Sequence, residues 1–600
     1  MNSARPILLA TLVSSALALP AAAQWSNDPT SNLALADTAN EEAQPKQAQR
    51  PGGGCYVSWF HSDPSGSPAF GYDVYLQRLD ADGNELWPHG GVLVADRGFS
   101  STQDYGLDVD ANGDALLTFR DDRLGGVQIT ATKVDASGSE VWGTGGVQLT
   151  NTTNFLAAPK IAATSDGAVV VAWTQDSTTH VQRLDGSTGA ATWANDVVLT
   201  PTSGNYGASD LHASNNGSVI LALQKSGSFA APRHLHAQKL SSTGAPLWGA
   251  SPLVVFDGGS LQFGNFPTFI TDGGAGAVFG WYTSSPALEC RAQRVTGNGT
   301  EVFAHNGVAA STNAAFDRVD PWVGYDPATR AVYLVYEELS LSTSGISAQK
   351  FDVAGVRQWT NNGVALVGQD SEEHTNARGV LRGTELAAFW VASPGFGQDR
   401  VESLRVDTNG AAIGSVLGVA TASTEKFRLS SALAADGDAV LVWQDGGSSE
   451  DVRAQNVTAH GTLGLPLTID GDTLSLATGG TRTMSIDGGP DRAGFLYFVV
   501  GTTAGTSPGF DLGSVHVPLS DDGPGGYLLW SIYNFNSGLL SNSLGLLDGA
   551  GQGTATFNLP AGANAMVGTV VHHAAGLFDL GSGFAVLETM TNPVGFELVP

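Results

Sequence analysis

The sequence predicts an all-β protein: an eight-bladed β-propeller followed by a C-terminal β-sandwich. Three observations support this. An apolar run recurs about every 55 residues, a second marker follows each run, and β-branched segments alternate with Asp-Gly and Asn-Gly turns. With 42% hydrophobic and only 14% charged residues, the 600-residue chain can bury a large core. We therefore expect the propeller over residues 42–472 and a separate β-sandwich domain over 473–600.

The recurring run defines eight copies of one structural unit. Within twenty residues after each run comes a triplet of the type Gln77-Arg78-Leu79, followed by a glycine and, in six copies, an aromatic residue four residues further on. One copy contains four strand-like segments, and its second strand is apolar on both faces, so neighbouring sheets must cover it. Closing the row into a ring buries the two end faces, which favours a propeller, although seven blades plus a divergent copy fit the spacing as well. The runs end at residues that we call anchors, which are Trp59, Phe119, Trp173, Leu223, Trp281, Tyr336, Trp390 and Trp443.

The aromatic residue of the last marker has two interpretations, a packing residue between blades or a stacking platform for a ligand. Its occurrence once per copy favours packing, because a ligand site usually breaks the symmetry of a repeat. The six clear examples are Trp87, Trp142, Trp193, Trp248, Phe303 and Trp359.

The two cysteines lie in copies that a ring of eight would place opposite each other. Cys55 belongs to the first copy and Cys290 to the fifth. A disulfide requires Cα atoms within about 7 Å, so we expect two buried, unpaired thiols.

The beginning of the chain has the pattern of a bacterial secretory signal. Arg5 precedes a short apolar run, and small residues follow up to Gln24. We expect residues 1–23 to be a signal peptide, 24–41 to be a polar leader arm, and the protein to be extracellular or on the cell surface. The net charge of -29 disfavours nucleic acid and anionic lipid as partners, and no apolar run is long enough to predict a transmembrane segment.

Two groups of residues resemble known families. The segments 474–480, 501–509 and 545–555, with His572 and His573, resemble a C-terminal domain of large secreted bacterial proteins of the planctomycete type. The segments 166–173 and 182–185 resemble the repeats of secreted bacterial propellers. Both resemblances imply a fold and an exported setting, and neither assigns a functional residue.

Candidate site residues follow from the repeat. If the first strand of each copy lines the central channel, the position fifteen residues before each anchor forms a ring at one mouth. Asp104, Asp320, His374 and Arg428 lie on or beside this ring and could supply an acid, a base and an anion clamp. A solvated channel rim without chemistry is the favoured alternative. The ring positions are Gln44, Asp104, Ala158, Ala208, Phe266, Pro321 beside Asp320, Thr375 beside His374, and Arg428.

One segment has the alternating oxygen ligands of a calcium loop. Asp108, Asp110 and Asn112 fit this pattern, but Phe119 stands where the twelfth position of such a loop needs glutamate. A hairpin turn is therefore the favoured interpretation. We predict no cofactor and keep calcium as the alternative.

These observations favour a secreted, non-catalytic binding or surface-attachment protein whose propeller ring faces an extracellular polysaccharide or protein. A carbohydrate-active hydrolase, sialidase-like or other, with its site at the channel mouth is the first alternative. A quinoprotein-like enzyme is the second, because residues 182–193 are similar in outline to a quinoprotein repeat, but the adjacent cysteine pair of those enzymes is missing.

Overall fold

The computed structural model describes residues 25–63, 71–98, 104–123, 125–228, 231–446, 449–459, 461–465, 467–489, 492–506, 509–512, 515–562, 567–581 and 585–600. The expected signal peptide lies outside the described residues. The chain divides into two compact units, Asn32–Gln455 and a second unit made of Met1–Ser31 with Asn456–Pro600. We call these the propeller unit and the C-terminal unit.

The described part of the propeller unit forms eight successive antiparallel sheets, and in each of the first seven the strands follow chain order outward from an inner strand. The first four sheets contain β2 (Glu42–Gln49), β3 (Cys55–Asp63), β4 (Gly71–Leu79) and β5 (Val92–Ala95); β6 (Gly106–Val109), β7 (Ala115–Asp121), β8 (Gln128–Val134) and β9 (Val147–Gln148); β10 (Leu156–Ala163), β11 (Ala168–Gln175), β12 (Thr178–Asp185) and β13 (Val197–Leu199); β14 (Asn205–Ala213), β15 (Val219–Ser226), β16 (His234–Leu240) and β17 (Leu253–Phe256).

The fifth sheet differs in that two short segments replace a single inner strand. The remaining sheets contain β18 (Ser260–Leu261), β19 (Phe269–Thr271), β20 (Ala277–Ser285), β21 (Glu289–Val295) and β22 (Val308–Ala309); β23 (Asp317–Asp326), β24 (Ala331–Leu339), β25 (Ser344–Phe351) and β26 (Val364–Asp370); β27 (Glu373–Arg382), β28 (Glu385–Ser393), β29 (Asp399–Val406) and β30 (Ala412–Thr424); β31 (Lys426–Leu433), β32 (Ala439–Asp445) and β33 (Asp451–Val457), joined by β1 (Leu33–Ala36).

The outer strand of the eighth sheet comes from the beginning of the chain. In β1, Leu33 pairs with Ala454 of β33, and Leu35 is fully buried. Residues 33–36 are therefore part of a sheet, whereas the sequence analysis assigned them to a polar leader arm. The short Leu-Ala-Leu-Ala run gains its partner only when the two ends of the unit meet.

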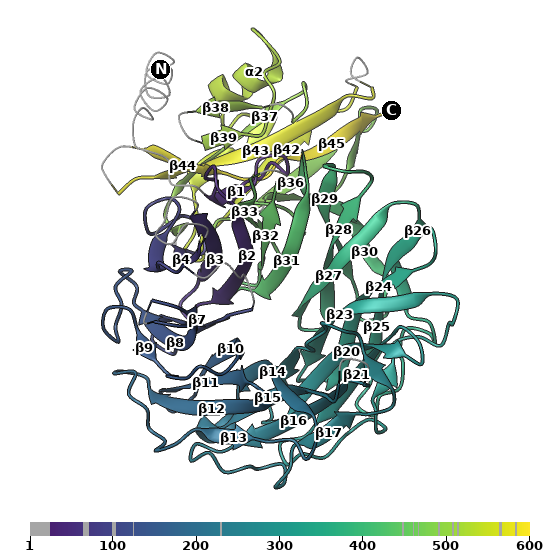
Figure 1. The fold of residues 1–600 in the computed structure, drawn as a ribbon. Helices are drawn as coiled ribbons and strands as arrows, with labels where there is room; N and C mark the ends of the chain where they lie inside the picture. Colours follow the sequence, from purple (N-terminus) through teal and green to yellow (C-terminus); the bar gives the residue numbers. More distant parts are fainter. Residues whose placement is uncertain are drawn as a thin grey trace. The chain divides into compact units, whose positions relative to one another are not determined.

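The inner strands of neighbouring sheets lie beside one another. β2 contacts β6 on one side and β31 on the other, and β10, β14, β19, β23 and β27 continue the series between them. Figure 1 shows β2, β10, β14, β23, β27 and β31 arranged around a common centre. This sheet order is that of a β-propeller, which confirms the all-β, propeller part of the predicted fold class.

The aromatic marker packs between sheets, as its regular spacing predicts. The indole nitrogen of Trp248 donates a hydrogen bond of 3.0 Å to the oxygen of Gly297 in the next sheet, and that of Trp359 reaches Thr408 in the same way. Gly299 follows in the same turn with a left-handed φ of 82°, and a Cβ there would lie 2.9 Å from the Trp248 ring. Five more glycines of the marker face the aromatic residue of the preceding copy in the same way: Gly138, Gly189, Gly244, Gly355 and Gly410.

The glutamine marker fixes the loop between the third and fourth strands. Gln293 is fully buried, its Nε2 donates to the oxygen of Ala304 at 3.0 Å, and its Oε1 accepts from the nitrogen of Phe303 at 2.9 Å. The basic residue that follows it, Arg294, pairs at 3.0 Å with Asp272 in the turn between the first two strands. Both parts of the marker therefore serve the structure of the repeat.

The cysteines confirm the predicted thiols. Cys55 and Cys290 are fully buried and neither forms a disulfide. Burial raises the pKa of the Cys55 thiol to about 12, so the thiol stays protonated and unreactive at neutral pH.

Two equivalent histidines bridge neighbouring sheets. Nε2 of His89 lies 3.0 Å from Asp37, just after β1, and its Nδ1 lies 3.0 Å from Glu85. His305 repeats the arrangement with Asp257, just after β17, at 3.1 Å and with Glu301 at 2.9 Å. Hydrogen bonds to these carboxylates raise the pKa of both imidazoles above the ordinary value. The largest contribution comes from Asp37 at His89 and from Glu301 at His305.

Replacing both histidines by glutamine is expected to lower stability at pH 5.5 and to have no effect at pH 8.5. A raised folded-state pKa means that the bridges contribute fully below the unfolded pKa of about 6.5 and lose their contribution as pH rises through the folded value. The side chains are 52% and 49% exposed, so solvent screening limits each bridge to roughly 0.5 kcal/mol. Thermal unfolding of both proteins across this pH range checks the prediction, and a constant difference would contradict it.

The C-terminal unit contains two main sheets that share one hydrophobic cluster, with Met484 and Phe557 from one sheet against Val499 and Ala575 from the other. The first sheet contains β34 (Leu467–Ile469), β36 (Gly480–Asp487), β42 (Gln552–Leu559) and β40 (Leu540–Ser541). The second contains β35 (Thr473–Ser475), β45 (Val594–Val599), β43 (Val570–Asp579), β37 (Leu496–Thr502) and β41 (Leu544–Leu546), with β44 (Val586–Met590) on β43. β38 (Phe510–Leu512) pairs with β39 (Val515–Val517).

The run 526–530, which the sequence pattern treats as one of the short apolar segments of a β domain, begins a helix instead. The helix α2 (Tyr527–Tyr533) has its first two amides bonded to the carboxylate of Asp522, at 2.8 Å from Tyr527 and 3.1 Å from Leu528. This cap satisfies amides that have no partner within the helix, which favours the helical conformation. No helix among the described residues is long and apolar enough to cross a membrane.

Candidate functional site

The inner strands carry a repeated β-bulge at the position from which the sequence analysis built its ring. Gln44, Ala158 and Arg428 have left-handed φ values of 54°, 48° and 55°, and the pairing of each inner strand shifts there. A non-glycine residue in this conformation costs of order 1 kcal/mol. Because the bulge recurs in several sheets, it belongs to the fold rather than to one ligand site.

The predicted ring is displaced by one residue in two sheets. The left-handed positions there are Asp320 and Asn376 rather than Pro321 and Thr375. The cause is the length of the hairpin that joins the bulge to the anchor, because Asp320 lies sixteen residues before Tyr336 and Asn376 lies fourteen before Trp390, against fifteen from Gln44 to Trp59. A prediction that assumes one fixed spacing from the anchor cannot detect such differences in hairpin length.

Asp104 lies between two lysines of the neighbouring sheets. Both Lys46 of β2 and Lys160 of β10 form ion pairs with its carboxylate, and Lys46 also donates to the oxygen of Tyr105 at 2.6 Å. Burial lowers the pKa of Lys46 to about 8, and burial together with the charge of Lys46 lowers the pKa of Lys160 to about 7. The sequence analysis missed both lysines, although each lies thirteen residues before its anchor.

Asp210 and His212 of β14 extend this group. Nε2 of His212 lies 3.1 Å from Asp210, which also accepts a hydrogen bond from the nitrogen of Phe269 at 3.1 Å. Burial opposes ionisation of Asp210, but the charge and hydrogen bond of His212 and the charge of Lys160 lower its pKa to about 2. Burial likewise opposes protonation of His212, and Asp210 raises its pKa. We call Lys46, Asp104, Lys160, Asp210 and His212 the inner charge cluster.

The inner charge cluster is accessible to solvent. The exposed fractions of its side chains run from 12% for Lys160 to 43% for His212. Four neighbouring sheets therefore present a partly hydrated wall of ionisable groups, in which each carboxylate already has a basic partner. Such a wall suits recognition of a polar ligand.

Asp320 belongs to a separate group. It pairs with Arg378 of β27 at 2.8 Å, and Glu337 of β24 accepts a hydrogen bond of 2.6 Å from the nitrogen of Asn376. Burial, and after it the charge of Asp320, raise the pKa of Glu337 to about 8.

The hydrogen bond that Glu337 accepts from the nitrogen of Asn376 has counterparts between other neighbouring sheets. Thr174 accepts from the nitrogen of Ala208 at 2.8 Å, and Gln444 accepts from that of Gln44 at 3.3 Å. Each of these residues directly follows an anchor. Holding the bulge of the next sheet is therefore a function of the position, and it does not require a carboxyl group.

His374 and Arg428 do not join Asp104 and Asp320. His374 is 2% exposed, with Nε2 at 3.1 Å from Asp370, and Arg428 is exposed. The four predicted site residues thus have different surroundings, and the proposed acid, base and anion clamp is not assembled from them. The partners that do assemble lie in other strands, which a spacing from one anchor does not identify.

The calcium-like segment forms a turn closed around an ammonium group. Asp110 accepts from the nitrogens of Asn112 at 2.9 Å and Asp114 at 3.0 Å, while its other oxygen lies 2.6 Å from Nζ of Lys133. Asp108 turns away and accepts from the nitrogen of Ala163 at 2.8 Å. Among the described residues, no three His, Cys, Asp or Glu side chains are arranged to hold a metal ion.

The fold and the inner charge cluster define the class of protein only as a β-propeller with a partly hydrated wall of ionisable groups on four of its sheets. No protein-family model and no curated protein matches the chain. It is similar in structure to the Dos1 propeller (10% identity, TM-score 0.39, 71% of this chain and 95% of that one). Polysaccharide lyase Uly1 gives 11% identity and a TM-score of 0.35 over 67% and 88%. Prolyl oligopeptidase B from Galerina marginata gives 14% and 0.36 over 74% and 58%.

Proposed function

We propose that the protein is a secreted, non-catalytic binding or surface-attachment protein of a bacterial cell exterior. Its eight sheets are the blades of one eight-bladed propeller, closed by β1, and the C-terminal unit is a β-sandwich that attaches the protein or binds a second ligand. The complete four-stranded eighth sheet supports eight blades over seven. The propeller domain then begins with β1 and ends with β33.

The observation that carries this proposal is the inner charge cluster. Each of its carboxylates has a basic partner in place, Asp104 two lysines and Asp210 His212. A general acid or base must be free to exchange a proton with substrate, and a matched set of ion pairs is better suited to binding. We propose an extracellular polysaccharide or protein as the ligand, in keeping with the net charge of -29, which disfavours nucleic acid.

The test is retention of the 24–600 chain on immobilised polysaccharides and extracellular matrix proteins, with the supernatant assayed for released sugars. We expect retention without release, and at least fivefold weaker retention for Lys160→Met. Lys350→Met, which removes a lysine of β25 outside the cluster, is the control and is expected to bind as the parent does. Sugar release, or no retention on any support, would overturn the proposal.

One observation favours a second candidate, a carbohydrate-active hydrolase. Glu337 with a raised pKa lies near the carboxylate of Asp320, and glycoside hydrolysis uses one protonated and one ionised carboxyl group. The structural role that Glu337 shares with Thr174 and Gln444 makes this the weaker candidate. Under it, sugar release by the parent chain would be lost in Asp320→Asn.

A further inference from the structure

Among the six copies that keep the marker aromatic, the loop between the third and fourth strands differs in one, the third sheet, where it joins β12 to β13. In the other five the marker glycine comes three positions after the first residue of the turn, as from Asp80 to Gly83, whereas Gly189 comes four positions after Asp185. After the aromatic residue, five copies reach the next strand in five residues, whereas Trp193 to Val197 is four. One residue is thus gained before Trp193 and one is lost after it, so this loop alone has a different path.

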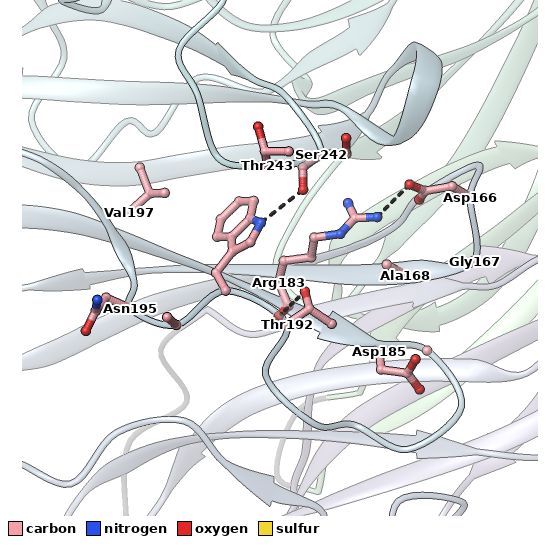
Figure 2. Close-up of a pocket in the computed structure, with 13 residues that line it drawn as sticks. Asp166, Gly167, Ala168, Arg183, Asp185, Thr192, Asn195, Val197, Ser242 and Thr243 are labelled. Carbon is pink, nitrogen blue, oxygen red and sulfur yellow. Dashed lines mark hydrogen bonds and ion pairs between the residues drawn. The ribbon is translucent and has the colours of Figure 1, made fainter.

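The altered loop borders a pocket of about 690 Å³ at the junction of the third and fourth sheets. Figure 2 shows Thr192, Asn195 and Val197 from the loop together with Ser242 and Thr243 from the turn of the next sheet. Its size lies in the range of small-ligand sites. The remaining lining residues are Asp166, Gly167, Ala168, Arg183, Asp185, Gly186, Trp193 and Ala194.

Trp193 is the marker aromatic that faces this pocket, and it is partly exposed. The five equivalent residues in other copies are only 2% to 9% exposed. Its indole nitrogen donates to the oxygen of Ser242 at 3.0 Å, which fixes the orientation of the ring (Figure 2 shows this bond). The pocket lining therefore includes the accessible part of an aromatic ring whose orientation is already fixed before a ligand binds.

The polar groups of the pocket are mainly hydrogen-bond acceptors. Partial burial favours a higher pKa for Asp166, but hydrogen bonds from Arg183 and Thr164 lower that pKa below its ordinary value. Hydrogen bonds from Ser187 and Thr188 lower the pKa of Asp185 to about 2. Both carboxylates are thus ionised at neutral pH.

The single cation of the lining is already engaged. Arg183 donates to Asp166 at 2.6 Å and to the oxygen of Gly217 at 2.9 Å. The pocket thus has two carboxylates and one guanidinium group that is already paired. This excess of negative charge repels an anionic ligand, and the carboxylates can accept hydrogen bonds from hydroxyl groups. Asn195 and Thr243, both exposed, add an amide and a hydroxyl group.

We infer that this pocket binds a neutral sugar ring of an extracellular polysaccharide, with the C–H face of the ring on Trp193 and its hydroxyl groups on Asp166, Asp185 and Asn195. This inference rests on the proposed function in taking the ligand to be extracellular polysaccharide, and it adds a site away from the inner charge cluster. A flat apolar surface flanked by acceptors matches the two faces of a sugar, and the broken symmetry distinguishes the third sheet from its neighbours.

The test is affinity electrophoresis of the 24–600 chain in gels containing laminarin, xylan or mannan, with alginate as the acidic comparison. We expect at least one neutral polysaccharide to retard the parent, and at least tenfold weaker retardation for Trp193→Ala and for Asp185→Ala, which changes a half-buried residue. Trp359→Phe alters the equivalent buried aromatic of the sixth sheet, which bonds to Thr408 and lines no part of this pocket, and is expected to bind as the parent does. Thermal unfolding shows that each variant is folded.

Three results would overturn the inference. Equal retardation of parent, Trp193→Ala and Asp185→Ala would place the sugar elsewhere, and retardation by alginate alone would exclude a neutral ligand; in both cases the proposed binding function stands. Absence of any retardation, together with no retention on the immobilised panel, would remove the proposed function as well.

Discussion

Replacing Glu337 by glutamine is expected to stabilise the protein at alkaline pH by on the order of 3 kcal/mol and to leave it unchanged at pH 4. The pKa of Glu337 is raised to about 8 in the folded protein, by burial first and by Asp320 second. Between its unfolded pKa and pH 8 the folded state keeps a proton that the unfolded state releases, so stability falls as pH rises. Glutamine carries no such proton and still offers an oxygen to the nitrogen of Asn376.

Urea unfolding of both proteins at pH 4, 6 and 9 measures the effect. Glu338→Gln is the matched control, because Glu338 pairs at 2.8 Å with Arg318, which is 3% exposed. Removing that carboxylate leaves a buried guanidinium without this partner and should destabilise the protein at every pH. A parallel pH dependence of the parent and Glu337→Gln would show that Glu337 ionises normally.

Replacing Trp142 by alanine is expected to cost about 3–5 kcal/mol of stability, the range for deleting a buried aromatic side chain. Trp142 is 7% exposed, and its nitrogen donates to the oxygen of Gly186 at 3.2 Å. The ring also fills the space beside Gly189, where an added Cβ would lie 2.8 Å from it. Its loss opens the contact between the second and third sheets.

The urea midpoint measures this loss, and Trp193→Ala provides the comparison within the same repeat. Because Trp193 is partly exposed, Trp193→Ala should cost less stability than Trp142→Ala, and it should remove sugar binding. Gly189→Ala should destabilise the same contact from its other side, and the double variant with Trp142→Ala should lose less than the sum of the two. Equal losses at Trp142 and Trp193 would contradict the packing role.

The repeat markers were predictable because each records a contact that every copy makes. Gln293 needs an amide to bond a loop at both of its ends, and Gly299 needs both a left-handed backbone and room for Trp248. These requirements are local or involve the adjacent copy, so they leave the same residue at the same spacing. The buried, unpaired thiols of Cys55 and Cys290 followed from the same register.

The candidate site was only partly predictable. Spacing identified Asp104 and Asp320 but not their partners Lys160 and Arg378, each of which lies in the inner strand of the next sheet. His374 belongs to a different environment because a hairpin one residue shorter moves the bulge to Asn376. Which charges meet at the centre depends on the summed lengths of hairpins, and no single motif contains that information.

By itself the sequence determined an all-β repeat with turns, buried second strands and aromatic residues between neighbouring copies, because those features depend on periodicity and on contacts repeated in every copy. Only the tertiary structure decided that residues 33–36 complete the eighth sheet, that 527–533 form a helix capped by Asp522, and that charges from four sheets form one cluster. These features depend on segments that meet only when the chain has folded, and their partners in sequence lie too far apart to leave a local pattern.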